Sequence, residues 1–280
     1  MKARSYTIVT PAYGKSAGVR VLHTLCHELN ELGFVAKLVL MGGGVPPHTN
    51  PKFNTPCLLK QENQYLDESI VIYPEVISGN PLGAKNVVRY ILNREGYING
   101  QSMGSEETDF ILSYSRAFVK AHQTLFIPVI DLNEFRFEED SVRDQNMLWI
   151  GKGKVEDLSG VPKGLVGITS NWPETPRDMA INFKRTKFLY SFDFMSSINI
   201  EAVMCGAVAV LVGKDKWGRK DLEFFELGVG GFAFGDSPSE IDRAIKSRGE
   251  QIDKVRQYTS EIRERVLNFV DATQSYFKKY

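Results

Sequence analysis

The stretch from 188 to 212, FLYSFDFMSSINIEAVMCGAVAVLV, contains two apolar runs on either side of a helical pattern. The first run, Phe188–Phe192, is short and aromatic, as in a buried strand, and the second, Val208–Val212, is apolar throughout. Between them the apolar residues recur at helical spacing from Ile198, and Gly206 stands where a helix would end. A strand, a loop, a helix and a second strand form the unit of a parallel sheet, so the chain is predicted to be an α/β protein.

The loop inside this unit carries groups suited to a phosphorylated ligand. A helix that begins at Ser196 or Ser197 presents unpaired N–H groups and the positive end of its dipole, where a phosphate binds well. Glu201, farther along that helix, can accept hydrogen bonds from the paired hydroxyls of a ribose. Asp193 lies at the carboxyl end of the preceding strand, the edge at which α/β proteins bind ligands. The pattern indicates a nucleotide-sugar site, although a capping residue and a solvated glutamate would explain the same sequence.

The same stretch resembles the donor-site signature of retaining GT-B glycosyltransferases, which place two carboxylates as E-x7-E ahead of an E-A-M-A-C-G-type helix. The chain keeps this spacing and the helix sequence EAVMCG, but it has Asp193 in place of the first glutamate. The resemblance implies a GT-B fold, in which two Rossmann-like domains face a central cleft. It also implies that the helix start holds the donor diphosphate through Ser196, Ser197 and Ile198. Glu201 would then contact the ribose and Asp193 the transferred sugar.

A loop rich in glycine and lysine follows the predicted strand Met147–Ile150. Its sequence, Gly151-Lys152-Gly153-Lys154, matches the G-[RK]-x loop with which GT-B donor domains open. In such enzymes the cation neutralises the donor diphosphate and assists its departure without a metal ion. The resemblance assigns this role to Lys152, with Gly151 as a neighbouring donor-binding residue and Lys154 in reserve. Taken alone, the residues are equally compatible with a flexible turn.

The segment after this loop contains the predicted site for the donor base. Gly164–Thr169 is predicted to form a strand, and the loop Ser170-Asn171-Trp172-Pro173 follows it. By resemblance this loop holds the base, with Trp172 stacking on it and Thr169 as a neighbouring donor-binding residue. A helix is predicted next, because Thr175, Pro176 and Asp178 form an N-terminal capping box.

The first 40 residues follow the opening pattern of a Rossmann-like domain. A predicted strand, Tyr6–Thr10, is followed by a loop with glycines, a helix with an apolar face and a second strand, Val35–Leu40. Two familiar phosphate-binding motifs are incomplete, because Gly14-Lys15-Ser16 lacks the earlier Walker A glycine and the dinucleotide fingerprint lacks its third glycine. Through the resemblance alone, Gly18 is expected to contact the donor phosphate or the acceptor.

A carboxylate in the first half of the chain is a candidate general base. Glu75 follows the predicted strand Ser69–Tyr73, and the segment YPEVISGNPLGAKNVVRYILNREG that contains it resembles one that recurs in glycan-assembly glycosyltransferases. After Glu75 the sequence predicts a helix whose buried face carries the apolar side chains of Val87, Val88, Ile91 and Leu92.

Three histidines are further candidates. His122 lies between two predicted strands, Asp109–Ser113 and Leu125–Ile130, and GT-B enzymes often place a histidine at such a strand end. A surface histidine is the simpler interpretation. His23 and His27 share one helix at a spacing compatible with a metal ion, but no third ligand stands nearby at a recognisable spacing. Both are interpreted as helix residues, one of them a candidate to face the cleft.

Composition narrows the class of protein. With 280 residues, 42% hydrophobic and 24% charged, the chain resembles an ordinary globular protein of one large or two modest domains. Lys+Arg of 34 equals Asp+Glu of 34, so there is no electrostatic case for a nucleic-acid partner. Three scattered cysteines predict a reducing compartment, and no signal sequence or membrane span is recognisable. We expect a cytoplasmic protein with at most peripheral membrane contact and with no metal or other cofactor.

The predicted organisation has two domains and a crossing helix. The acceptor-side domain is placed at 1–135, the donor domain at 136–262, and a C-terminal helix that crosses back to the first domain at 263–280. The charged segment 131–146 is the predicted linker. Helices are expected at Ser237–Ile245 and at Ile252–Phe277.

The predicted function is transfer of a sugar from a nucleoside diphosphate sugar to a glycan acceptor hydroxyl, as in polysaccharide biosynthesis. The transfer is expected to need no metal ion and to retain the anomeric configuration. The base is unknown, with UDP slightly favoured. Three alternatives stay open: an inverting GT-B transferase with a general base in the first domain, a GT-B-like sugar-nucleotide epimerase, and a non-catalytic module that binds nucleotide or glycan.

Overall fold

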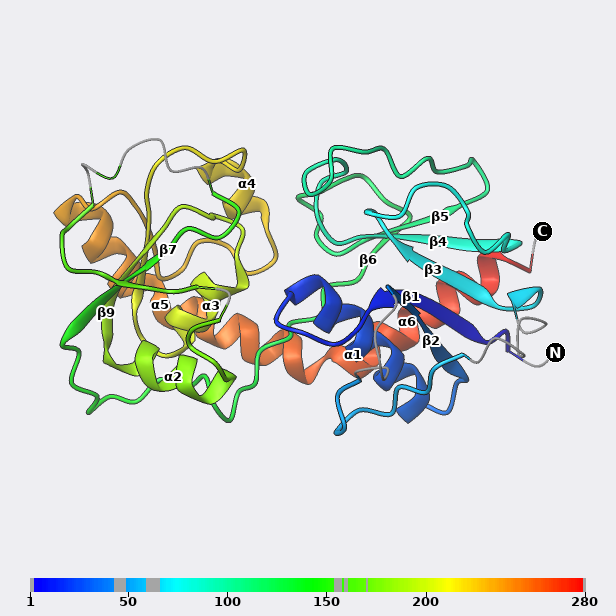
Figure 1. Ribbon diagram of the computed structural model, residues 1–280, viewed down its shortest axis with the longest axis horizontal. Helices are drawn as coiled ribbons and strands as arrows, with labels where there is room; N and C mark the ends of the chain where they lie inside the picture. Colours follow the sequence, from blue (N-terminus) through cyan, green and yellow to red (C-terminus); the bar gives the residue numbers. More distant parts are fainter. Residues whose placement is uncertain are drawn as a thin grey trace. The chain divides into compact units, whose positions relative to one another are not determined.

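The computed structural model describes residues 3–42, 49–58, 66–153, 158, 161–169 and 171–278 (Figure 1). The chain divides into two compact units: unit 1 comprises Met1–Val129 and Tyr258–Tyr280, and unit 2 comprises Ile130–Gln257. Each unit is built around a parallel β-sheet, so the α/β class expected from the sequence is confirmed. The predicted domains and the cleft between them stay predictions.

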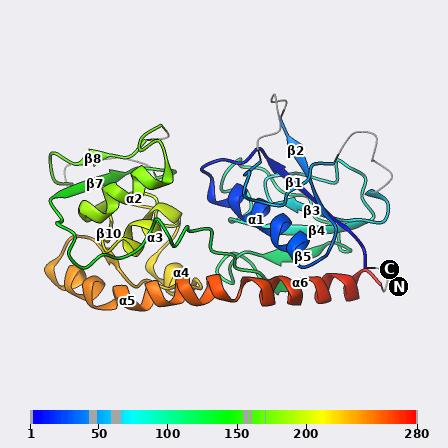
Figure 2. The same cartoon turned by 90° about the horizontal axis from the view of Figure 1, so that it is seen from below.

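The sheet of unit 1 has the strand order β2-β1-β3-β4-β5-β6, and every pair of neighbours is parallel. The strands are β1 (Tyr6–Pro11), β2 (Ala36–Met41), β3 (Ile70–Pro74), β4 (Asn86–Ile91), β5 (Phe110–Ser113) and β6 (Gln123–Thr124). Helices α1 (Ala17–Glu31) and α6 (Ile262–Tyr276) contact each other and share one apolar core with the sheet (Figure 2). The helical spacing of Leu22, Leu25 and Leu29 in α1 places all three in that core.

An irregular segment, not a helix, connects β3 to β4. Its residues Ile77 and Ala84 pack on a second apolar cluster with Tyr73 and Val87. The Asn80 side chain closes the turn, because its Oδ1 accepts a hydrogen bond from Ala84 N (3.0 Å) and its Nδ2 donates to Ala84 O (2.8 Å). These side-chain bonds satisfy backbone groups that a helix would have paired.

The helix expected around 87–92 is wrong, because Asn86–Ile91 forms strand β4. This strand pairs with β3 on one side and β5 on the other, and all six of its residues are buried. A strand covered on both faces has apolar side chains in consecutive positions, so its pattern resembles that of a buried helix. The β-branched pair Val87 and Val88 was the local signal for a strand.

The strand expected at Leu125–Ile130 is also wrong. Regular pairing stops with β6 at Thr124, and the following residues are buried without being part of the sheet. Leu125 N still donates to Ser113 O (2.8 Å), and Tyr90 Oη donates to Leu125 O (2.6 Å). Pro128 has no N–H to continue the ladder, so beyond Leu125 the apolar run packs in the interior without regular strand pairing.

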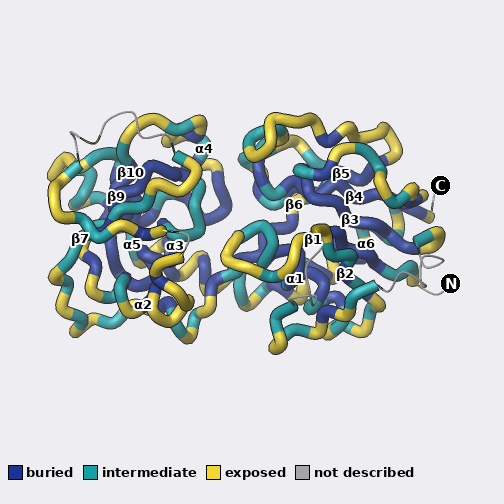
Figure 3. Tube along the Cα trace, viewed as in Figure 1, coloured by how far each residue is buried: buried dark blue, intermediate teal, exposed yellow. Residues whose placement is uncertain are grey.

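The sheet of unit 2 has the strand order β11-β10-β9-β7-β8, again with parallel neighbours. The strands are β7 (Gln145–Trp149), β8 (Val166–Gly167), β9 (Thr186–Ser191), β10 (Val208–Leu211) and β11 (Phe232–Phe234). The helices that begin in this unit are α2 (Pro176–Arg185), α3 (Ser197–Met204), α4 (Arg219–Phe224) and α5 (Pro238–Ser260). Strands β9 and β10 are largely buried, as their apolar sequences require (Figure 3). The strand expected at Gly164–Thr169 is reduced to the two residues of β8.

The two helices expected near the C-terminus are divided differently in the structure. One helix, α5, covers Pro238–Ser260, and α6 begins at Ile262 after a break at Glu261. The apolar residues Ile262, Val266, Phe269 and Val270 of α6 belong to the core of unit 1.

The first three strands have the same spatial order in both sheets. The first strand of each, β1 or β7, lies between the second and the third, so the chain turns to one side and then to the other. This is the topological switch point, at which open α/β sheets bind ligands beyond the carboxyl ends of the strands. In unit 2 it lies between β7 and β9.

Candidate functional site

The start of α3 lies at the switch point of unit 2. Ser196 is the N-cap, and its Oγ accepts hydrogen bonds from Ile198 N (3.4 Å) and from Trp149 Nε1 (3.0 Å). Trp149 is the last residue of β7, so this second bond ties the helix start to the neighbouring strand. The helix begins at Ser197, as its sequence predicts.

Two arginines bind the opposite end of α3. Arg143 donates to Cys205 O (2.8 Å), and Arg248 donates to Gly206 O. The Cζ atoms of Arg143 and Arg248 lie over the Phe137 ring, at 5.8 and 4.8 Å from its centroid. Cations at the C-terminus stabilise the helix dipole, whose positive end then points to the carboxyl edge of the sheet.

The loop after β7 packs tightly onto the end of β9. Lys152 N donates to Asp193 Oδ2 (3.1 Å), which joins the two loops at the switch point. Gly151 has φ +55°, and a Cβ built on it would overlap the Asp193 carboxylate. A Cβ on Gly153 would overlap the backbone of Phe192. The two glycines therefore allow the loop to lie directly on β9, and the Lys152 side chain stays exposed.

Both carboxylates of the sequence signature are buried, each with 3% of its surface exposed. Burial raises the pKa of Asp193, and the Lys152 N–H, the Lys152 charge and the Trp149 indole oppose that rise. Asp215 raises the pKa of Asp193 further through charge repulsion. Glu201 lies on α3 among buried residues, so the interpretation of it as a solvated surface group is wrong.

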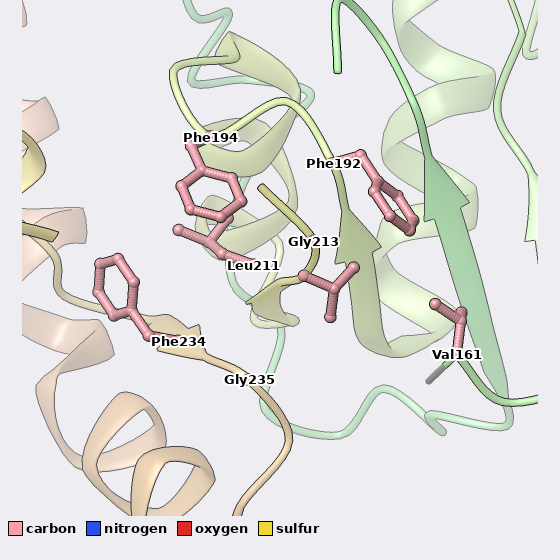
Figure 4. A pocket seen from close by; sticks show the side chains of 8 residues that line it. Val161, Phe192, Phe194, Leu211, Gly213, Phe234 and Gly235 are labelled. Carbon is pink, nitrogen blue, oxygen red and sulfur yellow. The ribbon is translucent and has the colours of Figure 1, made fainter. Parts of the chain in front are cut away.

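A pocket of about 430 Å³ opens at the carboxyl ends of β9, β10 and β11 (Figure 4). Phe194 and Phe234 lie on one side, with ring centroids 6.5 Å apart and planes nearly perpendicular, and Phe192 lies on the other. The described residues of the lining carry no charged or hydrogen-bonding side chain: they are Val161, Phe192, Phe194, Leu211, Val212, Gly213, Phe234 and Gly235. Such a lining suits a flat or apolar group.

The residues expected around the donor diphosphate and the base are only partly described. Lys154 and Ser170 lie outside the described residues. Thr169 Oγ1 accepts from Trp172 N (3.0 Å), and the Trp172 side chain is 40% exposed. Both follow β8, which stands at the opposite end of the strand order from β10 and β11. Trp172 is not among the described residues that line the pocket of Phe192, Phe194 and Phe234, called here the phenylalanine pocket.

Glu75 and Gly18 come together at the carboxyl edge of the sheet of unit 1. Glu75 follows β3, is buried, and accepts a hydrogen bond from Leu92 N (2.9 Å) just beyond β4. A Cβ built on Gly18, in the first turn of α1, would lie 3.5 Å from the Leu92 side chain. The two residues that the sequence singled out thus share Leu92 as a neighbour.

The histidines are engaged in packing. His122 precedes β6 and accepts from Ile111 N (2.9 Å) through Nδ1, so it lies toward the amino ends of the strands, away from Glu75. His23 is buried, donates from Nε2 to Pro11 O (3.0 Å), and has a pKa lowered by burial. His27 Nδ1 accepts from Asn54 N (3.0 Å).

Sequence reasoning missed three residues that organise the site. Trp149 bonds the cap of α3, and Asn199 Nδ2 donates to Asp193 O (2.8 Å) and to Phe194 O (3.2 Å). Asp215 Oδ2 accepts from Phe194 N (2.8 Å). The available signal was their position: each lies in or next to a loop at the carboxyl end of a strand.

Comparison with known proteins adds little to this description. No family model matches the chain, and no curated protein matches it. The chain is similar to the solved structure of the spinosyn forosaminyltransferase SpnP, at 12% identity over 95% of each chain with a TM-score of 0.42. The described part of the chain has no helix long and apolar enough to cross a bilayer.

Proposed function

We propose that this chain is a glycosyltransferase that transfers a sugar from a nucleoside diphosphate sugar to a hydroxyl of a glycan acceptor. The observation that carries the proposal is the meeting of three elements at the switch point of unit 2. These are the Gly151–Gly153 loop, the end of β9 and the N-terminus of α3. A helix N-terminus beside an exposed lysine is a suitable site for a diphosphate.

Charge stabilisation of the leaving group is the main catalytic contribution in this proposal. The bond between the anomeric carbon and the diphosphate oxygen breaks, and the acceptor oxygen bonds to the anomeric carbon on the same face. The acceptor proton passes to the departing phosphate oxygen. Lys152 and the first turn of α3, at Ser197 and Ile198, stabilise the negative charge that develops, without a metal ion. Glu201 accepts hydrogen bonds from the ribose.

The base of the donor is proposed to occupy the phenylalanine pocket. The pocket adjoins the helix start, since Phe194 precedes the Ser196 cap by two residues. Rings stack on a flat base without requiring hydrogen-bonding side chains. Trp172 is the position expected from the sequence. Phe234→Ala and Trp172→Ala therefore distinguish the two candidate base sites. Only the substitution of a residue that contacts the base should weaken nucleotide binding.

Two alternatives make different use of the same donor site. An inverting transferase requires a general base, and Glu75 is its best candidate because it lies at the carboxyl edge of unit 1 with Gly18. A sugar-nucleotide epimerase converts its substrate without an acceptor, so product analysis in the absence of acceptor identifies it. A non-catalytic module binds the nucleotide and leaves the sugar attached.

The test is a binding panel of UDP, GDP, dTDP and CDP, measured by calorimetry and thermal shift with EDTA present. We expect one nucleotide to bind, and at a hundredfold excess over its Kd to stabilise the protein by about 2.7 kcal/mol. Lys152→Ala should weaken binding by about tenfold or more, because it removes a charge-assisted contact.

Lys246→Ala is the matched control for this experiment. Lys246 also lies in unit 2, and its side chain is 74% exposed in a pair with Asp242 on α5. Its removal should leave nucleotide binding unchanged. Absence of binding by all four nucleotides would refute the proposal, and release of the nucleoside diphosphate from a bound sugar conjugate on adding acceptor would support transfer.

A further inference from the structure

We infer that Asp193 is a positioning residue that holds the Gly151–Gly153 loop in place and does not bind the transferred sugar. The inference rests on the proposed function, in which this loop binds the donor diphosphate. It assigns to Asp193 a role different from the one expected from the sequence signature.

The carboxylate is engaged by the loop itself. Its Oδ2 accepts a hydrogen bond from Lys152 N (3.1 Å), and the Trp149 indole, which caps α3 through Ser196, lies beside it. A carboxylate that accepts from a backbone N–H makes a charge-assisted bond, which is stronger than a bond between neutral groups. Asp193 thus fixes the backbone of the residue whose side chain supplies the cation.

The loop also covers the carboxylate. Gly151 lies so close to Asp193 Oδ2 that it has no room for a Cβ, and Asp193 has only 3% of its surface exposed. A sugar hydroxyl would have to displace Gly151 to reach Oδ2. That displacement would also disturb the hydrogen bond from Lys152 N to the same oxygen.

Three other side chains hold the backbone at Asp193 and Phe194 by hydrogen bonds. Asn199 Nδ2 donates to the carbonyls of Asp193 and Phe194, and Ser191 Oγ donates to Asp193 O (3.1 Å). Asp215 Oδ2 accepts from Phe194 N. Because these bonds hold the main chain, the Asp193 side chain has a defined direction, toward the loop. The arrangement is that of a support for a binding loop.

The first experiment needs no ligand. Amide exchange at Lys152 is compared in wild type, Asp193→Asn and Asp193→Ala, with the amides of β9 and β10 as internal references. We expect Asp193→Ala to accelerate exchange at Lys152 by about tenfold or more while the strand amides keep their rates, since one charge-assisted bond is lost. Asp193→Asn retains one acceptor oxygen, so its exchange rate at Lys152 should lie between those of the wild type and Asp193→Ala. Unchanged exchange at Lys152 in Asp193→Ala would overturn the inference.

Asp178→Asn is the matched control for the exchange measurement. Asp178 is another carboxylate of unit 2 at a helix start, where it accepts from Thr175 Oγ1 (2.6 Å) at the cap of α2. Its replacement should leave Lys152 exchange at the wild-type rate. Acceleration at Lys152 by this variant as well would indicate general loosening of the unit and would contradict the inference.

The second experiment separates the loop from the sugar. Binding of UDP, GDP, dTDP and CDP is compared with binding of their glucose conjugates, in wild type and in both Asp193 variants. If Asp193 supports the loop, Asp193→Ala should weaken binding of a nucleotide and of its glucose conjugate by the same factor. A loss confined to the conjugate would overturn the inference. If no nucleotide binds the wild type, the proposed function fails, and the exchange at Lys152 still decides the role of Asp193.

Discussion

Gly151 is one of two glycines in the Gly151–Gly153 loop that lie too close to the residues after β9 to carry a side chain. Its φ of +55° lies in the left-handed region, where a side chain costs about 1–2 kcal/mol. A Cβ would in addition overlap the Asp193 carboxylate and lie 2.7 Å from Trp149 Nε1. We therefore expect Gly151→Ala to lower the free energy of unfolding by more than the backbone term alone.

Gly164 offers the matched control for this prediction. It has φ +79° in the same unit, and no atom of the described residues lies within 4 Å of a Cβ built on it. Gly164→Ala should therefore show the backbone term without the steric conflict. Urea unfolding of both variants measures the difference, and equal losses of stability would contradict the packing described for the loop.

The buried His23 side chain is expected to make the protein less stable in mild acid. Burial lowers its pKa below 6.5, and its Nε2 donates to Pro11 O. Above pH 6.5 the imidazole is neutral in both states. As the pH falls below 6.5, the unfolded chain binds a proton that the folded chain does not, so the free energy of unfolding decreases until the folded pKa is reached.

His23→Gln tests this prediction, because its amide can donate to the same carbonyl without titrating. Urea unfolding at pH 7.5 and 5.5 gives the change in stability for each protein. The wild type should lose more stability between the two pH values than the variant does. An equal loss would show that other groups cause the acid sensitivity.

Helices α2 and α3 depend on one arginine at their C-terminal ends. Arg143 donates to Lys184 O (3.1 Å), Thr186 O (3.0 Å) and Cys205 O (2.8 Å), all beyond or within the last turn of a helix. Arg143→Ala removes these bonds and leaves carbonyls in a half-buried position without a partner. We expect a loss of about 2–3 kcal/mol in unfolding free energy.

Arg185→Ala is the matched control for this prediction, because Arg185 is the last residue of α2. Arg185 pairs with Asp144 (2.8 Å), and both side chains are about half exposed, at 55% and 48%. Exposed pairs of this kind contribute little to stability. A loss in Arg185→Ala as large as that in Arg143→Ala would contradict the assignment of Arg143 as the shared cap. Thermal and urea unfolding of the two variants decide the matter.

At the scale of the whole molecule, the C-terminal helix completes the core of the first unit. Phe269 of α6 is fully buried and lies 5.7 Å from the Tyr6 ring of β1, measured between centroids. Phe269→Ala should lower the stability of unit 1 by about 3–5 kcal/mol, because it leaves a cavity between α6 and the sheet. Amide exchange of β1 and β3 in urea reports this unit directly.

Leu267, also on α6, is the control for this prediction. Its side chain is 41% exposed, so Leu267→Ala removes little buried surface. A similar effect of the two substitutions would mean that α6 does not complete the core through Phe269. Unit 2 has a separate apolar core, so its strand amides should exchange at wild-type rates in both variants.

Much of the fold was predictable because its signals are local. The capping box at Thr175 requires only Asp178, three residues away, and the structure contains it, with Asp178 N donating to Thr175 Oγ1 (3.1 Å). The start of α3 after Ser196 and the positive φ of Gly206 follow from neighbouring residues in the same way. Sequence spacing therefore predicted the alternation of strands and helices at 6–41 and at 176–211, whereas β2 to β8 follow one another without a described α-helix between them.

Tertiary contacts decided the features that local patterns leave ambiguous. Val87 and Val88 fit a buried helix as well as a buried strand, and pairing with β3 and β5 made them a strand. The Asp193 carboxylate fits a sugar contact equally well from its sequence position, and Lys152 N, 41 residues away, gives it a partner in the loop. The phenylalanine pocket combines the ends of three strands. Sequence spacing specifies which atoms are near along the chain, whereas these features depend on atoms that only folding brings together.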